Sequence, residues 1–321
     1  MAATDSTLFA ADGVAGQIYH APASTGAFYL DITTPVENWA DVAASSDSAK
    51  AVACVDGGRI YTANLLDVWT AQPGSPVANW SSVVCSSDRA KIAATVRGGR
   101  IYTSGDSGVT WTAQPGSPNV TWSALAGSSD GTKLVAVVAG GFIYTSADSG
   151  VTWTARANDA NRNWTAVTSS ASGANLAAVV NGGGVYTSAD FGATWTAQPA
   201  LPTGPWSSIS CSADGGVLIA AANPGLVYVS QNFGVWWVPQ TLNGTGTAAV
   251  TAVVVTPDGT AFAATVDGVG LFATQGAAST GTTSRGTAGY IQGGVGTSIE
   301  LQYLGNGQWQ SLSHEGKISG F

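Results

Sequence analysis

The sequence predicts an all-β fold, a seven-bladed β-propeller with four-stranded antiparallel blades. One observation is the composition, because 42 Gly, 12 Trp and only 9% charged residues suit short strands joined by tight turns. A second is that each repeat reads as four short strands. A third is the repeat itself, with an aromatic residue recurring at intervals of 42, 41, 42, 42, 42 and 44 residues, the period of a propeller blade. These aromatic residues are Tyr19, Tyr61, Tyr102, Tyr144, Tyr186, Tyr228 and Phe272.

One complete repeat shows the expected strands in order. Trp122–Ala126 is the first strand, which lies innermost in a blade, and Lys133–Val138 is the second. Phe142–Thr145 and Val151–Ala155 are the third and fourth strands. Gly and Asp residues separate these runs, as turns require. The second strand is apolar on both faces, which is expected of a sheet packed between two neighbouring sheets.

The turn between the third and fourth strands carries a repeated motif, Ser-x-Asp-x-Gly-x-Thr-Trp, at 104–111, 146–153 and 188–195, with a diverged copy at 230–237. The Asp side chain accepts hydrogen bonds from turn amides, and Gly adopts positive φ. This motif resembles the Asp-box, or BNR repeat, of β-propeller proteins. The resemblance implies that three carboxylates form turns and are neither general acids nor metal ligands: Asp106, Asp148 and Asp190.

The two ends of the chain complement each other. Residues 7–31 contain the second, third and fourth strands of a repeat with no first strand before them. Near the C-terminus, Trp309–Ser313 has the first-strand pattern with no second strand after it. We therefore predict that Trp309–Ser313 completes the N-terminal blade and closes the ring, which leaves no unpaired edge.

The chain is predicted to form a single domain over residues 1–321. Its one irregular segment is a loop at 276–296, which replaces the motif of the last repeat and is low in apolar residues. Ser298–Leu304 is the expected fourth strand of that last blade. Residues 289–316 also resemble the C-terminal β-hairpins of some phage-tail and bacterial surface proteins.

A ring of Trp residues at the start of the innermost strands is the main binding candidate. Indole faces stack on the apolar patches of sugar rings, while nearby amide and Arg groups hold hydroxyls. The alternative interpretation is that each Trp fills the gap between two blades. The candidate ligand-binding residues are Trp39, Trp80, Trp122, Trp164, Trp206, Trp309, Arg59 and Arg100, which share the face opposite the Asp turns.

Composition excludes several classes of partner. The net charge is −8, and the 11 Lys and Arg form no basic stripe, which argues against nucleic-acid binding. No apolar run approaches the roughly 18 residues that a membrane-crossing helix needs, so membrane insertion is not expected. Cys54, Cys85 and Cys211 lack C-x-x-C spacing, and His20 and His314 are isolated. No metal site and no cofactor are therefore predicted.

The motif leaves the function open, because sialidases, endoglucan hydrolases, sortilin-type receptors, assembly factors and lectins share it. A sialidase needs an Arg triad and a Tyr–Glu pair, but this chain has no Arg-Ile-Pro motif and only three Glu. The carboxylates outside the repeated turns include Asp41, Asp56 and Asp267, and they make no distinctive pair for glycoside hydrolysis. A non-catalytic role is therefore preferred.

We predict a carbohydrate-binding, lectin-like propeller whose ligand is a glycan or cell-surface molecule, with repeated weak sites that add avidity. A protein-interaction or assembly scaffold is the alternative, and an Asp-box glycoside hydrolase is the third. The oligomeric state and the localisation stay open. An extracellular or cell-surface location is favoured, although residues 1–5 show no sign of a signal peptide.

Overall fold

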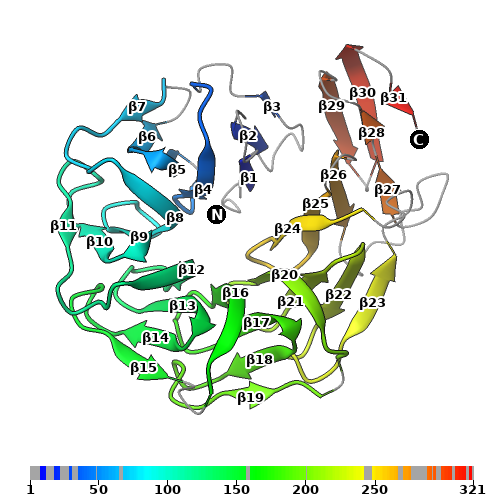
Figure 1. Ribbon diagram of the computed structural model, residues 1–321. Helices are drawn as coiled ribbons and strands as arrows, with labels where there is room; N and C mark the ends of the chain where they lie inside the picture. The colour runs from blue at the N-terminus through cyan, green and yellow to red at the C-terminus, as the bar shows by residue number, and fades with distance from the viewer. Residues whose placement is uncertain are drawn as a thin grey trace.

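The computed structural model of the chain is an all-β propeller, with no helix in the part of the chain that it describes (Figure 1). No candidate for a membrane-spanning helix occurs there either. The described residues are 8–11, 18–21, 29–30, 35–47, 49–64, 68–156, 160–199, 201–241, 248–266, 270–275, 288–290, 292–293, 298–305, 308–315 and 318–319. Side chains are described only within 35–266.

Antiparallel sheets follow one another along the chain, and the strands from β4 to β27 are arranged as successive four-stranded meanders. The first sheet is β1 (Leu8–Ala11), β2 (Ile18–Ala21) and β3 (Tyr29–Leu30). Next come β4 (Trp39–Ala44), β5 (Lys50–Gly58), β6 (Ile60–Asn64) and β7 (Thr70–Ala71), then β8 (Ala78–Cys85), β9 (Ile92–Gly99), β10 (Ile101–Ser104) and β11 (Thr112–Ala113).

The later sheets repeat this order. They are β12 (Val120–Gly127), β13 (Leu134–Gly141), β14 (Ile143–Ser146) and β15 (Thr154–Arg156), then β16 (Arg162–Ser169), β17 (Leu176–Gly183), β18 (Val185–Ser188) and β19 (Thr196–Ala197). After them come β20 (Gly204–Cys211), β21 (Leu218–Ala222), β22 (Leu226–Ser230) and β23 (Val238–Thr241), then β24 (Val250–Val255), β25 (Ala261–Val266), β26 (Gly270–Gln275) and β27 (Ala288–Tyr290).

The first strand of each four-stranded sheet lies nearest the centre of the ring (Figure 1). Hydrogen bonds between backbones join the turns that follow these strands, each N–H donating to the carbonyl of its counterpart in the next sheet. The chain of bonds stops at Pro257, which has no N–H to donate. Its members are Ser46 to Ser87 (2.8 Å), Ser87 to Ser129 (2.7 Å), Ser129 to Ala171 (2.8 Å), Ala171 to Ala213 (2.7 Å) and Ala213 to Pro257 (2.8 Å).

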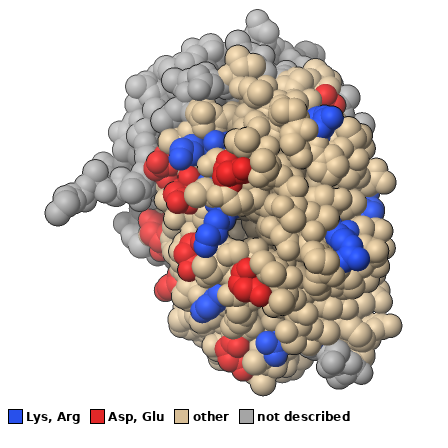
Figure 2. Space-filling view, turned by 90° about the vertical axis from the view of Figure 1, so that its left-hand side faces the viewer, with Lys and Arg blue, Asp and Glu red and all other residues tan. Residues whose placement is uncertain are grey.

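The sheets expose two faces with different turns. The Asp-turn face carries the turns after the innermost strands together with the Asp motifs, as the bond from Ser107 N to Ala90 O (3.0 Å) shows. The Gly-turn face carries the Gly-Gly turns and the longer connections between sheets, where Arg59 Nη1 donates to Pro73 O (3.1 Å). Figure 2 shows acidic and basic side chains interleaved along one side of the molecule.

The C-terminal strands correct two predictions from the sequence. β30 (Gln308–Glu315) pairs with β29 (Ser298–Gly305), with Trp309 opposite Tyr303, so Trp309–Ser313 does not complete the β1–β3 sheet. The fourth strand of the last sheet is β27 rather than Ser298–Leu304.

The physical reason is chain entropy, because β29 and β30 are separated by two residues. Pairing β30 with β1 instead closes a loop of almost the whole chain. Without that closing strand, the count of seven blades stays a prediction. The predicted loop at 276–296 also contains two strands, β27 and β28 (Gln292–Gly293), and β28 pairs with β31 (Ile318–Ser319). Residues 276–287 lie outside the described part.

Candidate functional site

The Trp residues at the start of the innermost strands are buried. Their exposed fractions are 2% for Trp39, 0% for Trp80, Trp122 and Trp164, and 1% for Trp206. Each ring packs edge-on or tilted against aromatic rings of its own sheet, as Trp80 does against Tyr102, with 5.3 Å between ring centroids. Trp80 Nε1 also donates to Gly58 O of the preceding sheet at 3.1 Å.

These indoles therefore fill the spaces between adjacent sheets, and a sugar ring cannot reach them in this structure. The side chain of Trp309 lies outside the described part, as do those of His20 and His314. The two Arg residues predicted to bind ligand also act within the fold. Arg100 Nη1 donates to Pro115 O (2.7 Å) and Ser117 O (2.9 Å), and Arg59 Nη1 donates to Pro73 O and Ser75 O. Each guanidinium thus holds a Gln-Pro-Gly-Ser-Pro connection in place.

The Asp motifs form compact hydrogen-bonded turns. In the turn after β18, Asp190 Oδ1 accepts bonds from Thr194 N (2.9 Å) and Ser188 Oγ (2.8 Å), while Oδ2 accepts one from Thr194 Oγ1 (2.7 Å). Phe191 and Gly192 adopt positive φ, 57° and 75°. The N–H and hydroxyl of Thr194 lower the pKa of Asp190 from its ordinary value, so the carboxylate is ionised at neutral pH. Asp106 and Asp148 form the same turn.

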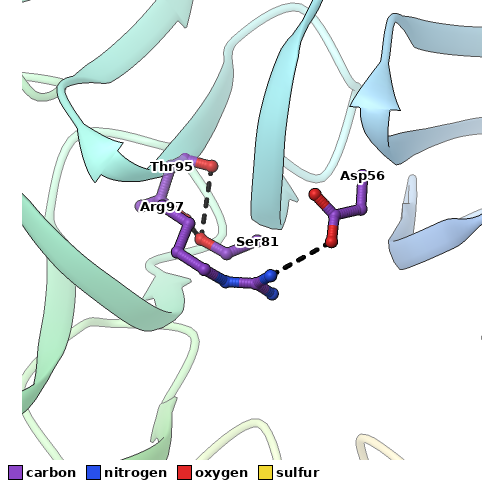
Figure 3. A network of polar contacts seen from close by, with 4 residues as sticks. All are labelled: Asp56, Ser81, Thr95 and Arg97. Carbon is purple, nitrogen blue, oxygen red and sulfur yellow. Dashed lines mark hydrogen bonds and ion pairs between the residues drawn. The ribbon is translucent and has the colours of Figure 1, made fainter.

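Of the three carboxylates considered for glycoside hydrolysis, Asp41 and Asp56 have described side chains, and both have partners. Asp41 lies on β4 and accepts hydrogen bonds from Ser82 Oγ (2.6 Å) and Val83 N (3.0 Å) of the next innermost strand. Desolvation raises the pKa of Asp41 above its ordinary value. Asp56 forms an ion pair with Arg97 across two sheets at 3.0 Å, close to the polar contact between Ser81 and Thr95 (Figure 3). Asp267 lies outside the described part.

Cys54, Cys85 and Cys211 are free cysteines. Burial raises the pKa of Cys85 to about 12 and that of Cys211 to about 11, so both thiols stay protonated at neutral pH. Cys54 is fully buried. Among the described residues, no group of three or more His, Cys, Asp or Glu could hold a metal ion.

A pocket of about 270 Å³ opens between the β16–β19 and β20–β23 sheets. We call it the polar gap. One wall carries amide, hydroxyl and carboxylate groups, and the other carries an aromatic ring. The first wall includes Asn175, Thr187, Ser188, Asp190, Thr194 and Thr196, and the second includes Gly215, Leu218 and Phe233.

The preceding gap between sheets explains why a pocket forms at this place. There Lys133 occupies the position of Asn175, and its Nζ donates to Ser172 O of the next sheet (3.1 Å) while lying 5.6 Å from the centroid of the Phe191 ring. The Lys stem therefore crosses the gap and covers the aromatic ring. Asn175 is shorter, so Phe233, which is 53% exposed, stays uncovered.

The following gap has the opposite character. Ser188 of the first wall is kept as Ser230, but the other five polar residues of that wall are replaced 42 residues later by apolar or uncharged ones. Trp236 is 68% exposed and Val238 is 46% exposed. We call this set the apolar rim, and its members are Val217, Val229, Asn232, Trp236 and Val238, in place of Asn175, Thr187, Asp190, Thr194 and Thr196.

The backbone of the two turns is nevertheless the same. Trp236 N donates to Asn232 Oδ1 (2.8 Å), as Thr194 N donates to Asp190. Gly234 N donates to Ser230 Oγ at 2.9 Å. Phe233 and Asn175 were not among the residues predicted to bind ligand. The signal that could have found them is their departure from the repeat, since the equivalent residues of an earlier gap are Ser149 and Lys91.

Comparisons with known proteins agree on the fold. No protein-family model matches the chain, and no curated protein sequence matches it. The structure is similar to a GH74 xyloglucanase from Xanthomonas campestris, with a TM-score of 0.71 and 12% identity, covering 88% of this chain and 52% of that one. It is also similar to an ancestral GH74 enzyme, with a TM-score of 0.60 and 17% identity, covering 78% of this chain and 37% of that one.

A third similar structure is YCF48 from Cyanidioschyzon merolae, with a TM-score of 0.63 and 13% identity, covering 86% of this chain and 97% of that one. The chain spans only about half or less of the two GH74 structures. Hydrolases and proteins whose descriptions name no enzyme occur among these neighbours. At these identities the likeness shows the fold, and the chain is a β-propeller.

Proposed function

We propose that this protein is a non-catalytic, lectin-like propeller that binds carbohydrate in the polar gap. The observation that carries the proposal is a pocket with hydroxyl, amide and carboxylate groups on one wall and an exposed aromatic ring, Phe233, on the other. A sugar ring needs both kinds of contact, since its hydroxyls form hydrogen bonds and its C–H face stacks on an aromatic ring.

The size of the pocket supports a small ligand. Drug-sized molecules occupy pockets of roughly 300–1,000 Å³, and the polar gap has a volume of about 270 Å³. One sugar unit is therefore the expected occupant. Such a site is weak by itself, and avidity from several copies on a surface would strengthen it.

The polar atoms of the wall have capacity left for a ligand. Asp190 is exposed to solvent, and the one side-chain hydroxyl that donates to its Oδ2 is that of Thr194, so a ligand donor can approach this oxygen. Asn175 Nδ2 donates to Asp214 O at 2.8 Å, and its Oδ1 has no hydrogen-bond partner among the described residues. A sugar hydroxyl can donate to either oxygen.

The lining of the polar gap differs from that of the preceding gap at one position, where Asn175 replaces Lys133. This difference provides a matched test. Asn175→Lys copies Lys133 and should cover Phe233, which reduces sugar binding by about tenfold or more. The matched variant Lys133→Asn should uncover Phe191 and create a second site. We suggest a glycan array to find a sugar, followed by calorimetric titration to count sites per chain.

The controls separate binding from folding. Both variants should keep the circular dichroism spectrum and melting temperature of the parent, because both positions are at the surface and their backbone bonds stay. The proposal is contradicted if no glycan binds the parent protein, or if Asn175→Lys binds sugar as tightly as the parent does.

A second candidate function, a protein-interaction scaffold, is favoured by the apolar rim. Trp236 and the adjacent Val235, exposed by 68% and 71%, are large apolar groups on the surface, and such groups gather at protein interfaces. A structure described as YCF48 bound to D1 peptide is similar to this chain, with a TM-score of 0.60 and 14% identity, covering 81% of this chain and 90% of that one. A screen of apolar peptides against the parent and the Trp236→Thr variant separates the two functions, since sugar binding in the polar gap does not need Trp236.

A further inference from the structure

We infer that the polar gap accepts neutral sugars and amino sugars and discriminates against acidic sugars such as uronic and sialic acids. This inference rests on the proposed function and specifies the chemical class of its ligand. It follows from which charged groups the gap contains.

The only charged side chain among the described lining residues is Asp190. Its two oxygens are held in place by Ser188 and Thr194, so the carboxylate cannot rotate away from a ligand without breaking three hydrogen bonds. Because Asp190 is exposed to solvent, a donor from the ligand can approach Oδ2 beside the Thr194 hydroxyl. A hydroxyl or an ammonium group can donate to this oxygen, and a ligand carboxylate cannot.

The gap also lacks the cation that could offset this charge. The equivalent position in two earlier gaps holds Lys91 and Lys133, and here it holds Asn175. The wall that faces Asp190 consists of Gly215, Leu218 and Phe233, none of which carries a charge. A sugar carboxylate placed in the gap therefore meets a fixed like charge with no counterion from the protein.

The expected discrimination is modest, because Asp190 is exposed to solvent. Exposed charge pairs contribute about 0.2–1 kcal/mol, which corresponds to a difference in affinity of at most about fivefold. The difference should shrink as salt is raised, since salt screens exposed charges. Relative to the neutral sugar, the amino sugar should bind more tightly, by about the same factor by which the acidic sugar binds more weakly.

The test uses sugars that differ only in one group. Galactose, galactosamine and galacturonic acid are titrated into the parent protein at low salt, and then glucose, glucosamine and glucuronic acid. We expect the order of affinity to be amino sugar, neutral sugar, acidic sugar in whichever series binds. The variant Asp190→Asn should bring the three affinities together.

The chain contains the control for folding of that variant. Asn232 forms the same turn as Asp190, with Ser230 Oγ 3.0 Å from its Oδ1, so an Asn at position 190 can hold the turn. If the acidic sugar binds as tightly as the neutral one, or if Asp190→Asn keeps the original order, the inference on charge is overturned while sugar binding stands. If no sugar of any class binds, the proposed function fails and this inference fails with it.

Discussion

The polar gap and the apolar rim are equivalent parts of successive sheets, and they have opposite surfaces. Asp190 with Thr194 and Asn232 with Trp236 occupy the same turn positions, and the backbone bond to the side chain is 2.9 Å in one and 2.8 Å in the other. The buried Trp237 Nε1 still donates to Gly234 O at 2.8 Å in the second turn. The two turns therefore share the bonds that hold their backbone, while the exposed side chains at other positions, such as Thr194 and Trp236, differ.

The largest effect should come from removing the framework that both regions share. Trp122 has 0% exposure and packs between two sheets. Trp122→Ala should lower the free energy of unfolding by about 3–5 kcal/mol, because it leaves a large cavity. Urea unfolding followed by intrinsic fluorescence measures this loss. A loss below about 1 kcal/mol would show that the indole contributes little to the core.

The next largest effect should be a difference in how the two turns respond to acid. The Thr194 N–H and hydroxyl lower the pKa of Asp190 below its ordinary value of 3.8. A depressed folded pKa gives stability that is present above the unfolded pKa and is lost as pH falls through the folded value. Asn232 does not titrate.

Hydrogen–deuterium exchange, corrected for intrinsic rates, should therefore show that the Thr194 amide loses protection below about pH 3.8 while the Trp236 amide keeps it. Equal losses at both amides would contradict the role given to the Asp190 carboxylate. Several other turn carboxylates should respond similarly in acid. The hydroxyl of Ser128, for example, lowers the pKa of Asp130 to about 2.

A smaller effect is expected when one surface is converted into the other. The double variant Asn232→Asp with Trp236→Thr copies the polar turn and adds a hydroxyl-to-carboxylate bond like that of Thr194 to Asp190 (2.7 Å). It should change the free energy of unfolding by no more than about 1 kcal/mol, because the backbone bonds stay. Thermal unfolding checks the change. A strongly destabilised double variant would show that Trp236 supports the core.

The smallest effect on stability should come from Phe233→Ser, which copies Ser149 of an earlier gap. Phe233 is 53% exposed, so the free energy of unfolding should change by about 0.5 kcal/mol or less. Sugar affinity should fall by roughly fivefold, because an aromatic contact contributes about 1 kcal/mol. An unchanged affinity for sugar would show that the Phe233 ring does not contact the ligand.

The sequence repeat predicted the internal sheets of the fold, but it did not predict how the C-terminal strands pair. The period near 42 residues predicted internal sheets such as β12–β15, since each strand pairs with its neighbour in sequence. The predicted pairing of Trp309–Ser313 with the N-terminal sheet required a contact between the two ends of the chain. A first-strand pattern does not decide between the distant β1 and the adjacent β29, and the structure pairs it with β29.

The candidate site shows the same limit. The sequence indicated that Trp at the start of the innermost strands was important, without deciding between core and binding surface. The packing of Trp80 between two sheets gives it 0% exposure. The pocket arises only when Asn175 and Phe233, 58 positions apart, meet across two sheets.

By itself, the sequence determined the strands, the turns and the β-propeller class, because those depend on short-range spacing and on residues that suit tight turns. Tertiary structure alone decided which indoles are buried, where the C-terminal strand pairs and which gap stays open. These depend on how neighbouring sheets fill the space between them, as the contrast between Lys133 covering Phe191 and the shorter Asn175 beside Phe233 shows.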